Sequence, residues 1–330
     1  MNKFWKDMGI AAVMGLFLPA VLLTAVVSIA KNEEDSSPQS AAIADEITTP
    51  TEGKQLSRPV EILLLNESAE TIPMELNEYL TSVLLAEMPV SFEEEALKAQ
   101  SVVARTYIMR ASDGASKHEN AAACTDSSCC QGYMPVEAFL AKGGKEQDVQ
   151  HIRELVAATD GEVLTYEGKL IEATYFSCSG GATEDAVAVW GTDVPYLKSV
   201  ESPGEEHAAH YSDTVSFSAA DFADKLGVSL TGAPERWFGE TTYTAGGGVA
   251  NMEIGSQSFS GTQLRKLLGL RSTAFEMTAD DQTIVVTTRG FGHRVGMSQY
   301  GADAMAAAGS TYPEILTYYY QGTELTVYTD

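Results

Sequence analysis

Residues 9–30 are the feature that most restricts how this chain can be organised. All 22 residues of this run are uncharged, and an apolar helix of that length spans the hydrocarbon core of a bilayer. Lys3 and Lys6 precede the run, and three acidic side chains follow within four residues of Lys31. Because lysine and arginine favour the inner side of a membrane, we expect residues 1–8 in the cytoplasm, a transmembrane anchor at 9–30, and the remainder outside.

A cleaved signal peptide is the alternative interpretation of the same run, with Ser28 and Ala30 as the small residues before the cut. Signal peptides have a shorter apolar region, of about 7–15 residues. The length therefore favours an uncleaved anchor. The expected location is the cell membrane, crossed once with the N-terminus inside.

The next segment, residues 31–57, is polar and acidic and has few large apolar side chains. Such a composition buries too little surface to fold, so we expect a flexible linker. The stretch "PVEILLL" from Pro59 then predicts a strand that opens a folded extracytoplasmic domain over 58–330. The net charge of -25 argues against electrostatic binding to nucleic acid.

Two successive helices are predicted at the start of this domain. Apolar side chains recur at helical spacing over 75–87, and Pro89 disfavours helical geometry at the residue before it. Ser91 and Glu94 have the spacing of a capping box, which predicts that Ser91 caps a second helix running to about Arg110.

Later segments mix strands and helices without a regular alternation. Residues 161–177 predict two strands around a turn at Glu167 and Gly168, and residues 282–290 predict another strand. Further helices are predicted at 219–226, 262–268, 297–308 and 313–320. This order favours an α+β fold of mixed helices and antiparallel strands.

Glu87 lies in the last turn of the first predicted helix, among apolar neighbours. The negative end of the helix dipole and the loss of solvent both disfavour a charged carboxylate there. Both effects suit a general acid. An ordinary surface glutamate is the alternative.

Three ordered blocks carry a resemblance to a known family. They are "AEMPVSFEEEALKAQSVVARTY" at 86–107, "YFSCSGGATE" at 175–184 and "GFGHRVGMSQYGA" at 290–302. Together they resemble the signature of the family of stage II sporulation protein D and the amidase-enhancer proteins. The resemblance spans about residues 58–328, and three blocks in order are more specific than one motif.

The resemblance implies a peptidoglycan lytic transglycosylase with Glu87 as general acid and base. Such an enzyme cuts the glycan bond between N-acetylmuramic acid and N-acetylglucosamine and leaves a 1,6-anhydro end. Hydrolytic glycosidases usually need a second carboxylate. In the lytic reaction the C6 hydroxyl of the sugar is the nucleophile, so one carboxyl group can protonate the leaving oxygen and then accept the hydroxyl proton.

Further site residues are implied by the same resemblance, around a glycan-binding cleft. Lys98 and Arg105 would contact glycan or a muramic carboxylate; the alternative is a solvated helix edge paired with the acidic residues at 93–95. The other substrate-binding residues implied are Ser177, Ser179, Gly180, Gly181, His293, Ser298, Gln299 and Tyr300.

This chain departs from the family pattern in its last block. Phe291 stands where the family has tryptophan, which puts sugar stacking on an indole in doubt, and Arg294 stands where it has glycine. His293 has an alternative role as well. A lone histidine more often satisfies a buried backbone group than binds a ligand.

A cluster of metal-ligand residue types lies in a loop at 111–133. His118, Cys124, Cys129 and Cys130 occur within thirteen residues, whereas Cys178 lies far along the chain. Outside the membrane the cysteines could form disulfides. Adjacent cysteines would make a strained bridge with each other, however, and one histidine with three thiolates suits tetrahedral zinc. Some relatives carry zinc in the matching loop, so we favour a structural zinc over disulfides.

The resemblance also implies partners and a cellular role. It implies a cell-wall amidase, stage II sporulation protein P, and a membrane protein, M, acting together in septal peptidoglycan remodelling and engulfment at the sporulation septum. The preferred substrate would be glycan stripped of peptide. A noncatalytic glycan-binding module that recruits or stimulates an amidase is the main alternative. A zinc hydrolase is weaker, since four protein ligands leave no open position for water.

Overall fold

Two helices that meet at a short turn organise the main core of the protein. The computed structural model describes residues 59–63 and 70–328. Helix α1 (Leu76–Glu87) ends where Met88 takes an extended conformation, and α2 (Glu94–Arg110) begins six residues later. Both helices end where predicted, and α1 begins within one residue of its expected start, whereas α2 begins later than a cap at Ser91 would place it. The predicted anchor and linker lie outside the described residues, and no helix within the described ranges has the length and apolar character needed to cross a bilayer.

The capping box predicted at Ser91 and Glu94 does not form. The N-cap of α2 is Glu93, and its side chain makes no capping hydrogen bond. Residues 89–92 instead form a turn, in which the N–H of Phe92 donates to the carbonyl of Pro89. The Glu93 N–H donates to Oδ1 of Asp303 at 2.8 Å. A side chain from the far end of the chain therefore bonds the start of this helix.

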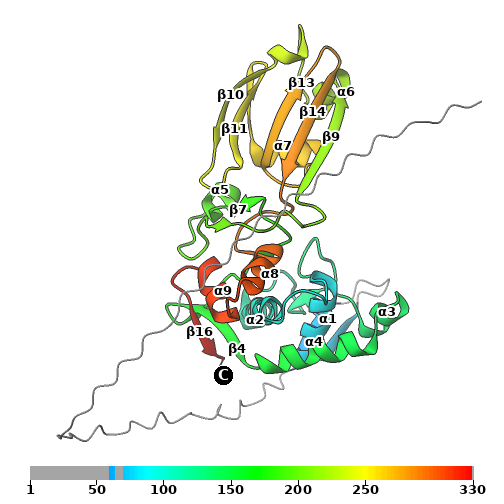
Figure 1. Ribbon diagram of the computed structural model, residues 1–330, viewed down its shortest axis with the longest axis vertical. Coiled ribbons are helices and arrows are strands. Elements are labelled where there is room, and N and C mark those ends of the chain that lie inside the picture. The colour runs from blue at the N-terminus through cyan, green and yellow to red at the C-terminus, as the bar shows by residue number, and fades with distance from the viewer. Residues whose placement is uncertain (1–58, 64–69, 329–330) are drawn as a thin grey trace, which may run out of the picture. The chain divides into compact units, whose positions relative to one another are not determined.

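Helices and one sheet surround α2. Helix α4 (Glu146–Ala158) packs on α1 and α2, while α8 (Gln299–Ala307) and α9 (Tyr312–Tyr319) pack on α2 (Figure 1). A three-stranded sheet in the order β16-β4-β5 also contacts α2. Its strands are β4 (Glu162–Tyr166), β5 (Lys169–Leu170) and β16 (Glu324–Val327). The turn between β4 and β5 confirms the predicted hairpin.

Several short elements connect this core. They are β1 (Pro59–Leu63), β2 (Thr71–Glu75), β3 (Ala123–Cys124), the π-helix η1 (Ala111–Ala115), α3 (Val136–Ala141), β6 (Tyr175–Phe176), β7 (Gly181–Ala182), α5 (Ala186–Trp190), β8 (Glu201–Ser202) and β15 (Met297–Ser298). Most strand pairs are antiparallel, as predicted. The β1–β3 and β6–β15 pairs are parallel, and both lie next to site residues.

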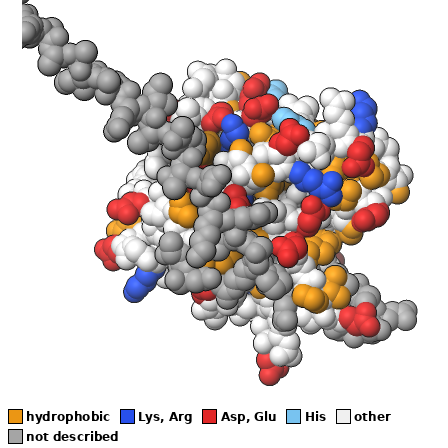
Figure 2. Space-filling model, turned by 90° about the horizontal axis from the view of Figure 1, so that it is seen from below, with side chains coloured by type: hydrophobic (Ala, Val, Ile, Leu, Met, Phe, Trp, Pro, Cys, Tyr) orange, Lys and Arg blue, Asp and Glu red, His pale blue; other side chains and the backbone are white. Residues whose placement is uncertain are grey.

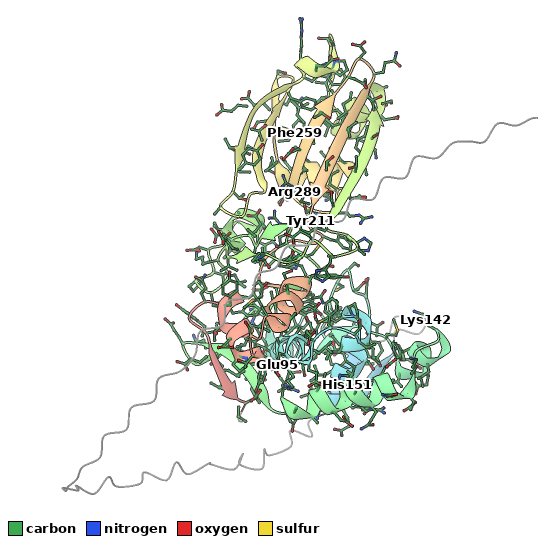
Figure 3. The ribbon with its side chains drawn as sticks, in the orientation of Figure 1. Glu95, Lys142, His151, Tyr211, Phe259 and Arg289 are labelled. Atoms are coloured by element: carbon green, nitrogen blue, oxygen red, sulfur yellow. The ribbon has the colours of Figure 1, made fainter. Side chains whose placement is uncertain are left out.

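Residues 212–289 build a second apolar core of their own. The strands are β9 (Ser212–Ser218), β10 (Phe238–Tyr243), β11 (Val249–Ile254), β12 (Gln257–Ser260), β13 (Ala274–Ala279) and β14 (Thr283–Arg289). They form the sheets β10-β11-β12 and β13-β14-β9, and the helical elements are α6 (Ala219–Leu226), η2 (Pro234–Arg236) and α7 (Gly261–Leu268). In Figure 3, Phe259 lies among the side chains of this core, and Tyr211 and Arg289 lie near its two chain connections.

The α+β class is confirmed by these two cores. Predicted helices at 219–226, 262–268, 297–308 and 313–320 all form within two residues of their expected bounds. The first core holds α1, α2 and the helices that pack on them, and the candidate site lies along this core.

Candidate functional site

Glu87 is placed by the way that α1 ends. The Met88 N–H still donates to the carbonyl of Leu84, but Met88 has φ −129° and ψ 143°. The residue before a proline favours this extended geometry, so the helix stops one residue after Glu87. No basic side chain lies in the last turn of α1. The carboxylate thus leaves the helix at its negative end, half-buried, as predicted.

Three donors from separate parts of the chain meet this carboxylate. The Gly132 N–H and the Tyr175 hydroxyl donate to Oε1, at 2.5 and 3.0 Å. The Gln299 side-chain amide reaches Oε2 at 3.4 Å. Oε1 is therefore held on two sides, whereas Oε2 has one long contact among the described residues.

The Tyr175 hydroxyl is the donor to Glu87, and its raised pKa keeps it protonated. Burial, and then the negative charge of Glu87, raise this pKa well above its usual value. The hydroxyl also lies 3.3 Å from Oε1 of Gln131, and the Gln131 amide donates to the Tyr79 hydroxyl at 3.2 Å. This buried network fixes the ring of Tyr175 against the carboxylate.

A cavity of about 950 Å³ opens onto Glu87. Its wall combines the end of α2, the cysteine loop, the segment from Glu172 to Ser177, the end of α5 and the segment from Phe291 to His293. Two exposed aromatic side chains line it, Trp190 at 42% and Phe291 at 39% of their surface. A wall of aromatic rings and polar groups suits a neutral, ring-shaped ligand such as a sugar.

The four predicted metal ligands come together beside this cavity. The ligand atoms of His118, Cys124, Cys129 and Cys130 all lie within 4.8 Å of one another. Nε2 of His118 is 3.3 Å from Sγ of Cys130 and 3.7 Å from Sγ of Cys129, and the two sulfur atoms are 3.8 Å apart. Tetrahedral zinc with bonds of about 2.3 Å holds sulfur ligands about 3.8 Å apart. The donor set and its spacing therefore fit zinc.

Thiol chemistry in the loop agrees with a ligand role. Burial opposes ionisation of Cys130, but the Cys124 backbone and His118 stabilise its thiolate, and its pKa falls to about 7. All four cysteines are free thiols, and Cys178 is buried outside this group. β3 pairs with β1 at Cys124, which anchors one end of the ligand set to a sheet.

The two cations predicted on α2 do not line the cavity. Lys98 forms an ion pair with Glu95 (Figure 3) at 2.8 Å, as the alternative interpretation expected. Arg105 is fully buried, and its guanidinium donates to the carbonyls of Thr159 and Val156 at 2.6 and 3.0 Å. This placement corrects the expectation that Arg105 contacts glycan. The helical spacing was right, but the face that carries Arg105 packs inside the core.

The substrate-binding residues predicted in the block at 175–184 lie in two different places. Ser177 lines the cavity. Ser179 is buried, and its hydroxyl and N–H donate to the carboxylate of Glu205, which also accepts from the Gly180 N–H. Gly180 and Gly181 border a separate, smaller pocket with Arg289. We therefore assign Ser179, Gly180 and Gly181 to the architecture of this turn and only Ser177 to the cavity.

The residues predicted in the block at 290–302 also differ in whether they line the cavity. His293 and Gln299 line the cavity. Ser298 is buried and caps α8 by accepting the Gly301 N–H, while Tyr300 packs its ring on Phe92. Nδ1 of His293 accepts the Val295 N–H at 3.1 Å. His293 therefore satisfies backbone, as its alternative role expected, and also forms part of the cavity wall.

Arg294 has a left-handed conformation, with φ 66°, which favours glycine. Its guanidinium is buried and pairs with Glu184 at 3.0 Å. It also donates to the carbonyls of Ser179 and Gly246 at 2.6 Å each. This side chain ties the loop after β14 to the β10–β11 connection, which accounts for an arginine where the family pattern has glycine.

Sequence reasoning missed several residues of the site. Tyr175, Gln131 and Gly132 contact Glu87 directly or through one hydrogen bond, and Trp190 and Arg110 line the cavity. Gln131 and Gly132 directly follow Cys130, and Tyr175 opens the second sequence block. Adjacency to those motifs was the available signal. Nothing in the local sequence paired these residues with α1.

Comparisons with known proteins agree with the sequence blocks. The family described as SpoIID: Stage II sporulation protein matches residues 66–166. Stage II sporulation protein D of Bacillus subtilis (strain 168) is 39% identical, over 98% of this chain and 96% of its own length. The protein of the same description from Bacillus amyloliquefaciens is 43% identical, over 79% of this chain and 76% of its own length.

A second kind of relative is more distant. The protein described as amidase enhancer in Bacillus subtilis (strain 168) is 31% identical over 76% of this chain, but the match covers 40% of that protein.

Proposed function

The chain belongs to the stage II sporulation protein D family, and from that premise we propose that it is a peptidoglycan lytic transglycosylase with Glu87 as its general acid and base. One observation carries the proposal. A half-buried carboxylate opens onto a cavity of about 950 Å³, and within the described residues one of its oxygens accepts from two donors while the other has a single long contact.

The two carboxylate oxygens would have different roles. Hydrogen bonds from Gly132 and Tyr175 favour Oε1 as the unprotonated oxygen, so the proton would reside on Oε2. Oε2 would donate this proton to the glycosidic oxygen as the bond to C1 of the muramic acid breaks. The C6 hydroxyl of that sugar would then bond to C1 and return its proton to Oε2. The products are an N-acetylglucosamine end with a free hydroxyl and a 1,6-anhydro end on the muramic acid, and Glu87 regains its proton.

Sugar binding would use the aromatic part of the wall. Trp190 is nearly half exposed, and its ring centroid lies 5.4 Å from that of His293. Aromatic faces combine a large apolar area with few rotatable bonds. The family pattern has a tryptophan at the position of Phe291. We propose that Trp190 supplies the indole for sugar stacking in this chain, and Phe291 lines the same cavity.

We further propose that His118, Cys124, Cys129 and Cys130 hold a structural zinc. Four protein ligands fill a tetrahedral site, so the metal would supply a cross-link and no open position for substrate. The last of these ligands, Cys130, is followed directly by Gln131 and Gly132. The zinc would therefore hold the Gly132 N–H against Glu87.

The location and partners follow from the same premise. We propose a membrane anchor at 9–30 with the catalytic domain outside, and a place in cell-wall remodelling during sporulation. A partner amidase would remove peptide stems first, and the name of the amidase-enhancer relative agrees with that association. Partners of the kind named stage II sporulation protein P and protein M remain part of this proposal.

Product analysis tests the proposal. The full-length protein, purified in detergent, is incubated with peptide-stripped glycan strands, and the fragments are analysed by mass spectrometry. We expect 1,6-anhydro ends, which are lighter by one water than hydrolysed ends. Hydrolysed ends would assign a different glycosidase mechanism.

A noncatalytic glycan-binding module is the second candidate, and the amidase-enhancer relative favours it. It predicts binding to the strands and stimulation of an amidase, without new glycan ends. Glycan of unchanged length after incubation with the purified protein alone would select this candidate over the enzyme.

A further inference from the structure

Arg110 is the last residue of α2 and lines the same cavity as Glu87. The protein around it is strongly acidic, with a net charge of -25. On the face shown in Figure 2, acidic side chains (red) are more frequent than basic ones (blue). A basic side chain in this cavity therefore stands out against the charge of the whole molecule.

The cavity contains two lysine or arginine side chains among its described lining residues, Arg110 and Lys117. The Lys117 ammonium donates to the backbone carbonyl of Cys129 and is thus engaged by the cysteine loop. The Arg110 side chain is 39% exposed, and the one ion pair that it forms within the described part of the chain, with Glu172, spans 3.9 Å. This distance is long for a charge-assisted hydrogen bond, which is usually about 2.7–2.9 Å.

The other arginines near the site differ from Arg110 in their surroundings. Arg105 and Arg294 are buried, and their terminal guanidinium nitrogens donate to carbonyl oxygens or pair with a carboxylate. Arg110 instead presents a planar fork of donors to a space large enough for a ligand. A fork of this kind matches the two oxygens of a carboxylate.

The backbone keeps this guanidinium at the cavity. Arg110 ends a helix of 17 residues whose central side chains are almost all buried. The chain then enters η1 and turns at Gly114, which has φ 103°. The position of Arg110 is therefore set by a packed helix, and little ordering of the backbone is needed when it binds a ligand.

Peptidoglycan offers a carboxylate whose presence depends on the peptide stem. Each muramic acid carries a lactyl group. While the stem is attached, the lactyl carboxyl is part of an amide and has no charge. Removal of the stem by an amidase leaves a free lactyl carboxylate, one negative charge per muramic acid.

We propose that Arg110 is a specificity-determining residue that binds the free lactyl carboxylate of peptide-stripped muramic acid. The inference rests on the proposed function, because it takes glycan as the ligand of the cavity. On binding, the ligand carboxylate replaces Glu172 as the partner of the guanidinium. Selection for stripped strands is then a property of one side chain of the cavity wall.

A binding experiment tests Arg110 separately from catalysis. The probes are a short peptide-free oligosaccharide of alternating N-acetylglucosamine and N-acetylmuramic acid, the same oligosaccharide with its lactyl carboxyls converted to neutral amides, and one that retains its stems. Dissociation constants are measured by calorimetry with the full-length Glu87→Gln protein, which is not expected to cut them.

We expect the carboxylate form to bind roughly tenfold more tightly than either other form, the usual size of one charge-assisted hydrogen-bonded contact. Adding Arg110→Gln should bring this ratio to about one, whereas Arg110→Lys should keep part of it. Glu172→Gln should raise the ratio, because it removes the competing carboxylate. Arg153→Gln is the matched control, since Arg153 pairs with Glu78 on the surface and does not line the cavity.

The inference and the proposed function can fail independently. A ratio that Arg110→Gln leaves unchanged, or no measurable binding of any oligosaccharide, overturns the inference. The inference is also overturned if the stem-bearing and stripped forms bind equally and both bind more tightly than the amide form. In that case the carboxylates of the stem could replace the lactyl carboxylate as the ligand. If the ratio depends on Arg110 but the wild-type protein produces no anhydro ends, the inference stands and the lytic activity fails.

Discussion

The Gly132 N–H donates to Oε1 of Glu87 at 2.5 Å, which joins the end of α1 to the residue two positions after Cys130. A Cβ at Gly132 would lie 2.8 Å from Oε1 and 3.3 Å from Cβ of Ala86. The carboxylate therefore needs glycine at position 132 to reach its donor.

Gly132→Ala should displace the Glu87 carboxyl and lower the rate of anhydro-end formation. The added methyl group is too close to Oε1, and small misplacements of a catalytic group are costly, so we expect a loss of roughly tenfold or more. The rate is measured by mass spectrometry of the fragments. Metal content and melting temperature are measured alongside. An unchanged rate in a folded protein would mean that the Gly132 contact has no part in catalysis.

Glu87→Gln should reduce turnover by about two to four orders of magnitude, because the amide keeps the shape but cannot transfer the proton. Glycan binding should persist. Glu94→Gln is the control: Glu94 lies in the first turn of α2 and outside the cavity, and it forms no capping box. Normal turnover by Glu87→Gln would remove this carboxyl from the mechanism.

Cys124→Ser should lower the metal content and the melting temperature together, because metal binding is coupled to folding of the loop. Elemental analysis and calorimetry of the full-length protein measure the two effects. Cys178→Ser serves as the control, since Cys178 is buried outside the ligand group. A wild-type protein that lacks metal and whose thiols are paired contradicts the prediction.

His293 should make the protein less stable as the pH falls. Burial, and then the nearby charge of Arg265, lower the pKa of His293 from 6.5 to about 4. Between these values the unfolded chain binds the extra proton, so this contribution to the free energy of unfolding is complete above about pH 6.5 and is lost towards pH 4.

The difference in melting temperature between pH 7 and pH 4.5 should therefore be smaller in His293→Gln than in the wild type. His151→Gln, on α4 and outside the cavity, is the control and should retain the wild-type difference (Figure 3). If His293→Gln loses stability with acid as steeply as the wild type, His293 is not a source of the pH dependence.

Trp190→Ala should weaken binding of peptide-free glycan by roughly tenfold, the scale of one aromatic contact together with its buried area. Trp190 belongs to neither apolar core, so the melting temperature should change little. Tyr243→Ala is the comparison, because Tyr243 is 59% exposed and lies outside this cavity. Equal effects of the two variants on affinity would contradict a stacking role for Trp190.

Several helices, one hairpin and the residue types of the site were predictable from local sequence alone. Pro89 fixed the end of α1 one residue after Glu87, because the residue before a proline disfavours helix. Helical and alternating apolar spacing gave the later helices and the β4–β5 hairpin. The spacing of His118 and the three cysteines predicted a group that the structure brings within 4.8 Å. All of these depend on neighbours close along the chain.

The side chains that meet Glu87 depend on long-range packing. Gly132, Tyr175 and Gln299 are 45, 88 and 212 positions away from it. The helix face that carries Arg105 was predictable, but its burial depends on the packing of α4 and β4. The start of α2 likewise depends on a distant residue, because Asp303 bonds it in place of Ser91. Local spacing sets the direction of a side chain on its own element. What that side chain then contacts depends on the packing of segments that are far apart in the sequence.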